Sequence, residues 1–237
     1  MRGARVGTAG WTVPRDVRDR FPPEGTQLER YAARFACVEI NSSFYRPHRP
    51  STYARWAASV PAGFRFALKL PKEITHARRL VDCAGPLDRF LAESAALEEK
   101  RGVLLVQLPP SFAYDAARAD AFFALLRARY DGLVACEPRH ASWFAADADG
   151  ALRSFAIARV AADPAPVPAA AAPGGWDGFA YHRLHGSPRM YYSAYDAAAL
   201  AALAQRLRAA TGPAWCVFDN TSLGAAAANA LDLAGLL

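Results

Sequence analysis

The stretch Leu133-Val-Ala-Cys-Glu137-Pro-Arg139-His140-Ala-Ser-Trp143 decides the fold class, because an apolar run passes directly into a carboxylate, a guanidinium, an imidazole and an indole. An apolar run of this length fits a strand that is buried on both faces, as the strands of a parallel sheet are. Pro138 ends the hydrogen-bonding ladder where the polar side chains begin. The stretch therefore predicts a buried strand that ends in a polar site.

The same pattern recurs along the chain. Further strands are expected at 4–11, 37–45, 64–71, 102–110, 157–163, 179–186 and 215–220. Helices are expected at 26–35, 51–59, 86–100, 116–130, 150–155, 196–210 and 223–237. This alternation favours a parallel sheet closed into a (β/α)8 TIM-like barrel, a fold whose active sites lie at the carboxyl ends of the strands.

The tract from Pro164 to Gly178 is rich in Ala, Pro and Gly and has no helical pattern. A loop is therefore expected in place of the helix after strand six. An open doubly wound sheet is the alternative fold, and it is less favoured because such sheets usually show a glycine-rich first turn. We predict a single barrel domain spanning residues 1–237, with no oligomeric state implied.

Composition narrows the class of protein. The chain has 237 residues, of which 53% are hydrophobic, so it can bury a large core. No apolar run approaches the roughly 20 residues of a membrane span, and the first residues lack a signal-peptide pattern, which predicts a cytoplasmic protein without a membrane partner. The four cysteines have no paired spacing, so neither a disulfide framework nor a structural zinc site is expected.

Seven motifs occur in order over nearly the whole chain. They are Gly7-Thr-Ala-Gly10-Trp11, Val38-Glu39-Ile-Asn41-Ser-Ser-Phe-Tyr45, Lys69-Leu-Pro71, Ile74-Thr-His76, Gln107-Leu-Pro-Pro-Ser-Phe112, Glu137-Pro-Arg139-His140-Ala-Ser-Trp143 and Arg183-Leu-His185-Gly186. With these motifs the chain resembles the YecE-like family, domain of unknown function 72. The resemblance implies a TIM-like barrel and the position of its site, and it assigns no reaction. Strand eight departs from the family pattern, since it ends in Asp219-Asn220 where the family looks more like Asn-Asn, and Asp219 is left out of the predicted site.

The predicted strand ends bring acids and cations to one mouth. An uncompensated charge inside a barrel is costly, so these groups either pair with one another or await a ligand of complementary charge. The candidate catalytic residues are Glu137, Glu39, His185, His140 and Lys69, and the candidate substrate-binding residues are Asn41, Tyr45, His76, Gln107, Arg139, Trp143, Arg183, Trp11 and Asn220. A purely structural ion network that closes the top of the barrel is the alternative.

The first functional hypothesis is a cofactor-independent enzyme that acts on a small substrate carrying a phosphate or a carboxylate. Lys69, Arg183 and Arg139 would hold the anion, because ammonium and guanidinium groups suit oxyanions. Glu137 or Glu39 would act as the general base. His185 or His140 would act as the general acid. The pattern does not distinguish a hydrolase from a lyase or an isomerase.

A divalent metal is a weaker alternative for the same mouth. Its ligands would come from Glu39, Glu137, His140, His185 and Asp219. No pair of these residues has a metal-binding motif spacing, and the neighbouring cations Lys69 and Arg183 would repel a dication. We therefore predict no metal ligands.

The second hypothesis is a barrel that binds or processes nucleic acid. The formal net charge of +6 invites it, although the arginines are scattered and solvated helix faces explain most of the excess. Phosphate contacts would come from Arg78, Arg79, Arg139 and Arg183, and stacking platforms from Trp11, Tyr45, Trp143, Tyr191 and Tyr192. The loop around Tyr191 can equally be a lid or a rigid cap.

Overall fold

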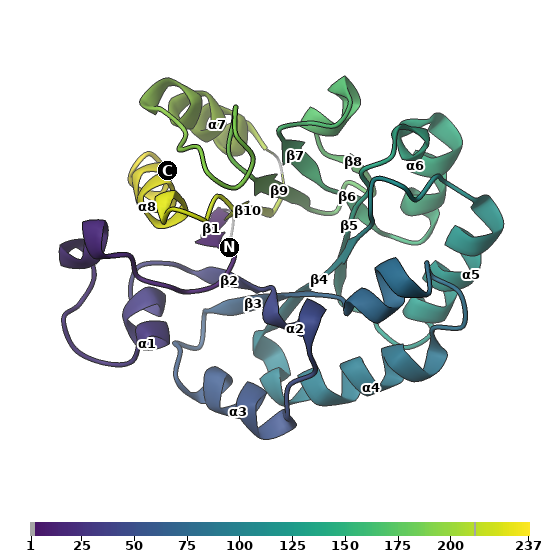
Figure 1. The fold of residues 1–237 in the computed structure, drawn as a ribbon, viewed down its shortest axis with the longest axis horizontal. Helices are drawn as coiled ribbons and strands as arrows, with labels where there is room; N and C mark the ends of the chain where they lie inside the picture. The colour runs from purple at the N-terminus through teal and green to yellow at the C-terminus, as the bar shows by residue number, and fades with distance from the viewer. Residues whose placement is uncertain (1–2, 211) are drawn as a thin grey trace.

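The computed structural model describes residues 3–210 and 212–237, which form an α/β fold with parallel sheets (Figure 1). The strands are β1 (Ala4–Thr8), β2 (Cys37–Ile40), β3 (Arg65–Lys69), β4 (Arg101–Gln107), β5 (Leu133–Glu137), β6 (Ala158–Arg159), β7 (Ala161–Asp163), β8 (Gly174–Gly175), β9 (Ala180–Leu184) and β10 (Ala214–Phe218). One sheet has the order β1-β10-β9-β7 and the other the order β2-β3-β4-β5-β6-β8. The β6–β8 pair is antiparallel, and the other strand pairs are parallel.

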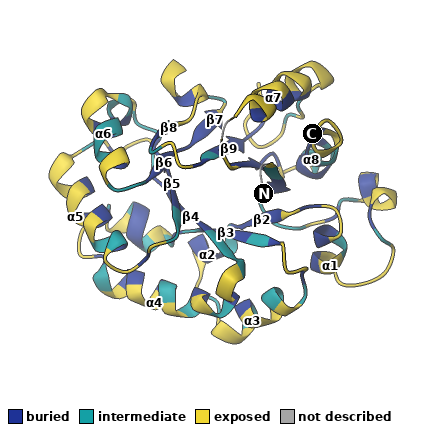
Figure 2. Ribbon diagram, turned by 180° about the vertical axis from the view of Figure 1, so that it is seen from behind, coloured by how far each residue is buried: buried dark blue, intermediate teal, exposed yellow. Residues whose placement is uncertain are grey.

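The helices lie outside the strands, which surround the centre of the molecule (Figure 1). They are α1 (Gln27–Ala32), α2 (Ser42–Tyr45), α3 (Pro50–Ala58), α4 (Ala84–Ser94), α5 (Ala116–Arg127), α6 (Ala146–Ser154), α7 (Ala197–Ala209) and α8 (Ala225–Gly235), with short turns η1 (Arg15–Arg20), η2 (Glu73–Ala77), η3 (Ala95–Lys100), η4 (Ala141–Phe144) and η5 (Pro168–Ala171). Figure 2 shows buried strands and helices whose outer surfaces are exposed. The core therefore lies between the strands and the inner faces of the helices.

Side chains at helix starts explain where several helices begin. The Thr26 hydroxyl accepts from the Glu29 amide while the Glu29 carboxylate accepts from the Thr26 amide, which is a capping box at the start of α1. Asp115 and Asp196 cap α5 and α7 by accepting hydrogen bonds from backbone amides. These residues satisfy amides that the helix itself leaves without partners.

The two sheets meet at two places. Ala9, just after β1, forms an isolated parallel bridge with Glu39 of β2. On the other side one segment serves both sheets, since β6 pairs with β5 and β7 pairs with β9, with only Val160 between them. The hydrogen-bonding pattern therefore does not form the single closed barrel of eight strands that the sequence predicts, because the sixth strand is divided between the sheets.

Many predicted elements have somewhat different bounds in the structure, and the following differences bear on the site and the sheets. The second strand stops at Ile40 because Asn41 takes helical backbone angles and α2 follows, so the period-two pattern predicted through Tyr45 is wrong beyond that point. Helix α6 begins at Ala146 rather than at Gly150. The tract after strand six is mostly a loop, as predicted, although it contains the turn η5 and the two-residue strand β8.

Close packing joins β1 to β2. A Cβ atom on Gly7 of β1 would clash with the backbone carbonyl oxygen of Cys37, so only glycine allows this approach. The four cysteines Cys37, Cys83, Cys136 and Cys216 are free and buried. Burial raises the pKa of each thiol.

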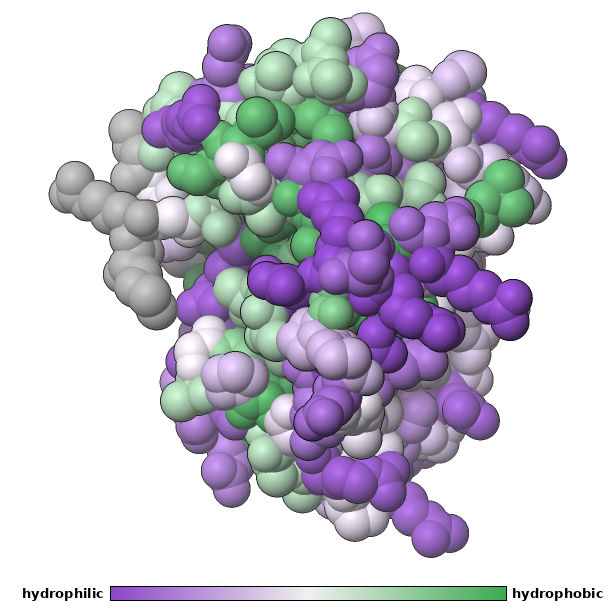
Figure 3. All heavy atoms as spheres, turned by 90° about the vertical axis from the view of Figure 1, so that its left-hand side faces the viewer, coloured by the Kyte–Doolittle hydropathy of each residue, from purple (hydrophilic) through white to green (hydrophobic). Residues whose placement is uncertain are grey.

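The surface of the molecule is mixed in polarity. On the side that carries α1 and α8, hydrophilic side chains cover much of the face and hydrophobic residues gather in smaller patches (Figure 3). None of the helices in the described part of the chain is long and apolar enough to cross a membrane.

Candidate functional site

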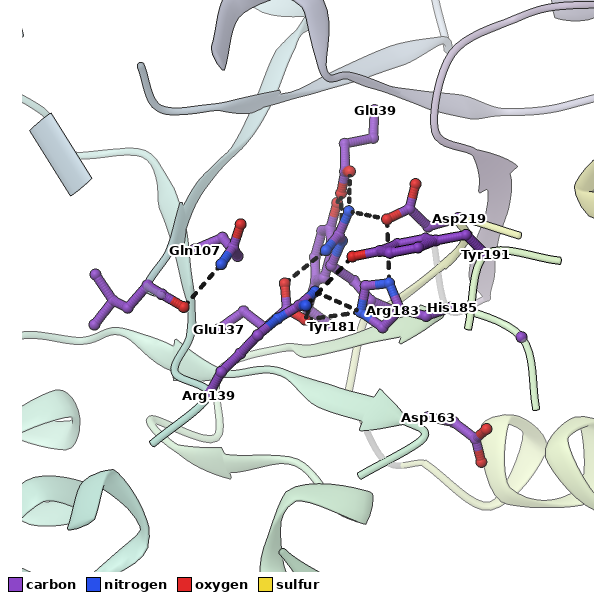
Figure 4. Close-up of polar contacts among 12 residues, drawn as sticks. Glu39, Gln107, Glu137, Arg139, Asp163, Tyr181, Arg183, His185, Tyr191 and Asp219 are labelled. Atoms are coloured by element: carbon purple, nitrogen blue, oxygen red, sulfur yellow. Dashed lines mark hydrogen bonds and ion pairs between the residues drawn. The ribbon is translucent and has the colours of Figure 1, made fainter. Parts of the chain in front are cut away.

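Parallel strands deliver the polar site to one end of the fold. Glu39 is in β2, Glu137 is the last residue of β5, and Arg183 is in β9. His185 and Asp219 follow directly after β9 and β10. Together with Arg139 these residues form what we call the ion network (Figure 4). The sequence therefore predicted correctly that several strands end in charged residues that meet.

Arg183 is the centre of the ion network and is fully buried. Its Nε and Nη2 atoms donate to the two carboxylate oxygens of Glu39 at 3.0 and 2.7 Å. Nη1 donates to Glu137 Oε2 at 2.6 Å, and Nη2 also donates to Asp219 Oδ2 at 2.9 Å. With a bidentate bond to one carboxylate and single bonds to two others, this guanidinium is engaged on every nitrogen.

His185 lies between two carboxylates. Its Nε2 is 2.8 Å from Glu137 Oε1 and its Nδ1 is 3.1 Å from Asp219 Oδ2. Burial lowers the pKa of His185, but the Glu137 charge and the hydrogen bonds to both carboxylates outweigh burial, so the pKa is raised above 6.5. The imidazolium form satisfies both carboxylates because each ring nitrogen then donates a hydrogen.

Two acids of the ion network, Glu137 and Asp219, are held in their ionised forms. Burial raises the pKa of Glu137, but Arg183, His185 and Arg139 outweigh it and hold the pKa well below 4.5. For Asp219 the same balance of burial against Arg183 and His185 lowers the pKa below 3.8. The Tyr181 hydroxyl donates to Glu39 Oε2 at 2.9 Å, which completes the bonding of that carboxylate.

Arg139 and Tyr191 cover the outer side of the ion network. Arg139 Nη2 donates to Glu137 Oε1 at 3.2 Å, and its Nη1 donates to the Tyr191 hydroxyl at 3.3 Å. The Tyr191 ring meets the His185 ring edge-on at 5.8 Å between centroids. Tyr191 is 37% exposed whereas His185 is 1% exposed, so Tyr191 separates His185 from solvent.

Lys69 ends β3 close to the ion network but is not bonded into it. Its Nζ lies 4.1 Å from the centre of the Phe44 ring and makes no ion pair with a carboxylate of the described residues. Burial lowers the pKa of Lys69 to about 8, and the charge of Arg183 also lowers it, against the opposing effect of the three carboxylates. Lys69 is thus a partly buried amine without a carboxylate partner.

Several other predicted binding residues lie around α2 and the strand ends. Asn41 precedes α2, and its buried Oδ1 has no hydrogen-bond partner within residues 3–210 and 212–237. His76 bonds to Thr75 and packs edge-on against Phe44, whereas Tyr45 is 78% exposed. Gln107 donates to the Leu108 carbonyl, and Trp11 packs against Trp56. None of these side chains bonds directly to the ion network.

Three further predicted residues make structural contacts. His140 Nδ1 accepts from the Ser142 amide and so caps η4. Trp143 is 1% exposed, and its Nε1 donates to the Phe112 carbonyl, which places the indole in the core. Asn220 Nδ2 donates to the Ser193 carbonyl and to Asn229 Oδ1, which ties the loop after β9 to α8.

Asp219, Tyr181 and Tyr191 contact the ion network, although none of them was among the predicted catalytic or substrate-binding residues. Asp219 was considered only as a metal ligand, and Tyr191 only as a stacking platform and as part of a lid or cap. Asp219 follows the apolar strand β10 just as Glu137 ends β5, so the same pattern could have identified it. Tyr181 shares the face of Arg183 on β9 at a spacing of two residues, which is also readable from the sequence. Tyr191 reaches the site from a loop, and no local pattern signals that.

The two histidines considered as metal ligands have other hydrogen-bond partners in the structure. Both ring nitrogens of His185 contact carboxylates, and His140 bonds to Ser142 instead. Within residues 3–210 and 212–237, no group of three or more His, Cys, Asp or Glu side chains is arranged to hold a metal ion.

Comparison with known sequences gives one family and two named relatives. The family model described as "Protein of unknown function DUF72" matches residues 5–237. The UPF0759 protein YecE of Escherichia coli K12 is 34% identical over 107 residues, which are 45% of this chain and 38% of that protein. The UPF0759 protein YunF of Bacillus subtilis is 26% identical over 150 residues, 59% of this chain and 51% of that protein. The matches thus span about half or less of these relatives.

Comparison with solved structures shows the same fold. A DUF72 family protein of Thermotoga maritima superposes with a TM-score of 0.80 at 24% identity, covering 99% of this chain and 98% of that one. A DUF72 family protein of Enterococcus faecalis superposes with a TM-score of 0.81 at 21% identity, covering 99% and 95%. At these identities the likeness concerns the fold alone.

Proposed function

Because the chain belongs to the DUF72 family, a family of proteins of unknown function, we propose a function from its site: an enzyme that uses acid–base chemistry on a small anionic substrate. The observation that carries the proposal is Lys69, a partly buried cation that has no carboxylate partner among the described residues and lies beside a closed ion network. Burying such a cation costs free energy, and a bound anion would offset that cost.

The charge balance of the mouth supports an anionic ligand. Glu39, Glu137 and Asp219 face three permanent or near-permanent cations, Arg139, Arg183 and Lys69. A protonated His185 therefore leaves one positive charge without a counterpart. A phosphate or carboxylate group on the substrate would supply the missing negative charge.

The proposed roles differ among the cations. Arg183 is already engaged by three carboxylates, so we assign it to positioning rather than to the substrate. Lys69 and Arg139 would hold the anion, since Arg139 contacts Glu137 through a single bond of 3.2 Å. Its other contacts are the exposed Tyr191 at 3.3 Å and His185 Nε2 at 3.4 Å.

Movement of Arg139 from Glu137 to the substrate anion would also prepare the base. Arg139 is one of the charges that hold the pKa of Glu137 low, so moving Arg139 onto the substrate anion would raise that pKa and make Glu137 a stronger base. His185, protonated and 2.8 Å from Glu137, would act as the acid. The chemistry needs no cofactor.

The proposal treats the two sheets as one TIM-like barrel with a shared mouth. Two features support this: the Ala9–Glu39 bridge between β1 and β2, and the continuous segment from β6 to β7 that pairs with both sheets. Sites of TIM barrels lie at the carboxyl ends of the strands, where the ion network is found.

A thermal-shift screen tests the proposal. The protein and Lys69→Ala are heated with phosphorylated metabolites, sugar acids and short oligonucleotides. A ligand at a hundred times its dissociation constant stabilises by about 2.7 kcal/mol, which raises the Tm of a chain of this size by roughly 5 to 11 °C. We expect small anions to stabilise the protein but not Lys69→Ala.

Two results would contradict the proposal. Stabilisation by oligonucleotides alone, fading with salt, would make nucleic acid the partner. No stabilisation by any anion would leave the ion network with a structural role. Once a substrate is found, Glu137→Gln is expected to lose at least a hundredfold in turnover, which is the usual contribution of a general base or acid.

A further inference from the structure

A large open cavity lies at the opposite ends of the strands from the ion network. Its volume is about 1030 Å³, at the upper limit of the range of small-molecule sites. It is lined by the first residues of β1, β3, β4, β5 and β10 and by the loops that lead into them. Because the strands are parallel, this cavity and the proposed active site are separated by the length of the strands.

Three arginines line this amino-end cavity and have no carboxylate partner in the described part of the chain. Arg5, Arg65 and Arg101 each use Nη1 to donate to backbone or hydroxyl oxygens. None of the three forms an ion pair with a carboxylate of the described residues. Burial lowers the pKa of Arg5, and the charge of Arg65 lowers it further, so these two like charges are close together.

The rest of the lining is apolar and aromatic. Phe35, Phe64, Tyr130 and Trp215 contribute rings to the cavity. Arg101 lies over the Tyr130 ring at 5.0 Å from its centroid, and Arg5 lies 5.9 Å from the Trp215 ring. A Cβ atom on Gly102 would come within 2.6 Å of the Trp215 ring, so glycine leaves room for this indole at the cavity floor.

We infer that this amino-end cavity is a second binding site, which takes a small molecule with an aromatic or apolar body and an anionic group. Rings and aliphatic side chains would receive the body of such a molecule, and the unpaired guanidiniums of Arg5, Arg65 and Arg101 would receive its carboxylate, phosphate or sulfonate group. Arginine suits this role because its planar fork bonds to oxyanions and also stacks on aromatic rings. The inference does not depend on the proposed function.

The test measures binding of two dyes that differ in charge. One is 1-anilinonaphthalene-8-sulfonate, an aromatic anion, and the other is N-phenyl-1-naphthylamine, its neutral counterpart. Isothermal titration is run on the whole protein and on Arg65→Gln, which removes one guanidinium. Gly63→Leu fills the cavity, because a Cβ atom at Gly63 meets nothing within 4 Å. Arg118→Gln on α5 and Lys69→Ala at the opposite end serve as controls, and circular dichroism checks that each variant folds.

We expect one sulfonate dye per chain, bound about tenfold more weakly by Arg65→Gln. The neutral dye should bind both proteins equally, and Gly63→Leu should abolish binding of both dyes. Arg118→Gln and Lys69→Ala should bind like the native protein. Absence of sulfonate binding, or binding that survives both Arg65→Gln and Gly63→Leu unchanged, would overturn the inference. Loss of binding in Lys69→Ala would do the same, since it would move the dye to the ion network.

Discussion

Lys69 shows how a largely buried cation can cost stability. Its folded pKa of about 8 lies below the 10.5 of an exposed lysine, so the charged form is disfavoured in the fold. That cost is fully present below about pH 8 and is relieved as pH rises toward 10.5. We expect Lys69→Met to raise the free energy of unfolding by about 1 to 2 kcal/mol at pH 7, after loss of the contact with Phe44. Urea unfolding at pH 7 and pH 10 should show the gain shrinking at the higher pH.

Lys100 provides the matched control for that substitution. Its Nζ donates to the Ala57 and Val60 carbonyls at 2.6 and 2.7 Å. Lys100→Met removes bonds that Lys69 lacks, so it should destabilise the protein. Destabilisation by both substitutions would show that Lys69 has a stabilising partner.

Glu137 is expected to stabilise the fold as well as to serve the proposed site. Glu137→Gln removes a charge that is paired with Arg183, His185 and Arg139 inside the protein. Breaking one side of a buried ion pair typically costs about 3 to 5 kcal/mol. We expect a loss of that size in urea unfolding and a fall in the pKa of His185 in an NMR titration. The exposed pair Arg20–Asp232 is the control, where Asp232→Asn should cost less than about 1 kcal/mol.

At the scale of the element, β1 depends on its glycine. Gly7→Ala should destabilise the protein by about 3 kcal/mol, because the new methyl group would push β1 away from Cys37 where one bridge joins the sheets. Gly3→Ala, just before the same strand, meets open space and should change stability by no more than about 0.5 kcal/mol. Thermal unfolding of the two variants makes the comparison. A similar effect at both positions would mean that the approach of β1 to β2 is not tight.

Strands were easier to predict than their ends. A strand that is buried on both faces needs a continuous apolar run, which is why β5 could be located from residues 133–137 alone. The end of β2 was not readable, because the backbone turns at Asn41 without a proline or glycine to signal it. The division of strand six between the sheets depends on distant partners, β5 and β9, which no local pattern contains.

The members of the ion network lie on strands or just after them and could be predicted from the sequence, whereas a contact made from a distant loop could not. Charged residues at strand ends identified Glu39, Glu137, Arg183 and His185, because parallel strands must bring their ends together. Whether a residue beyond the strand end turns inward depends on loop geometry. His140 caps a helical turn for that reason, whereas Tyr191 reaches the ion network from a distant loop.

At the scale of the whole molecule, acid should unfold the protein in two stages. The pKa of buried His182 is lowered by burial to about 4, so stability falls as pH drops from about 6.5 toward 4, by up to roughly 3 kcal/mol. His76 acts in the same direction. Below about pH 4.5, Glu137 and Asp219 lose the stability that their lowered pKa values provide.

Urea unfolding across this pH range, repeated on His182→Gln, checks the assignment. The variant should lose the His182 part of the first stage, leaving the smaller part from the less buried His76, and it should keep the second stage because the carboxylates of the ion network are unchanged. An unaltered first stage would assign it to groups other than His182.

Alkylation of the buried cysteines can report how often the structure around them opens. A thiol that is shielded and held protonated can be alkylated only when the structure around it opens, so its labelling rate reports how often that happens. Cys37 belongs to β2 and Cys216 to β10, which lie in different sheets. Equal rates at the two thiols would mean that both sheets open in one cooperative event. Unequal labelling rates would mean that one sheet opens more often than the other, so the two sheets separate before the whole protein unfolds.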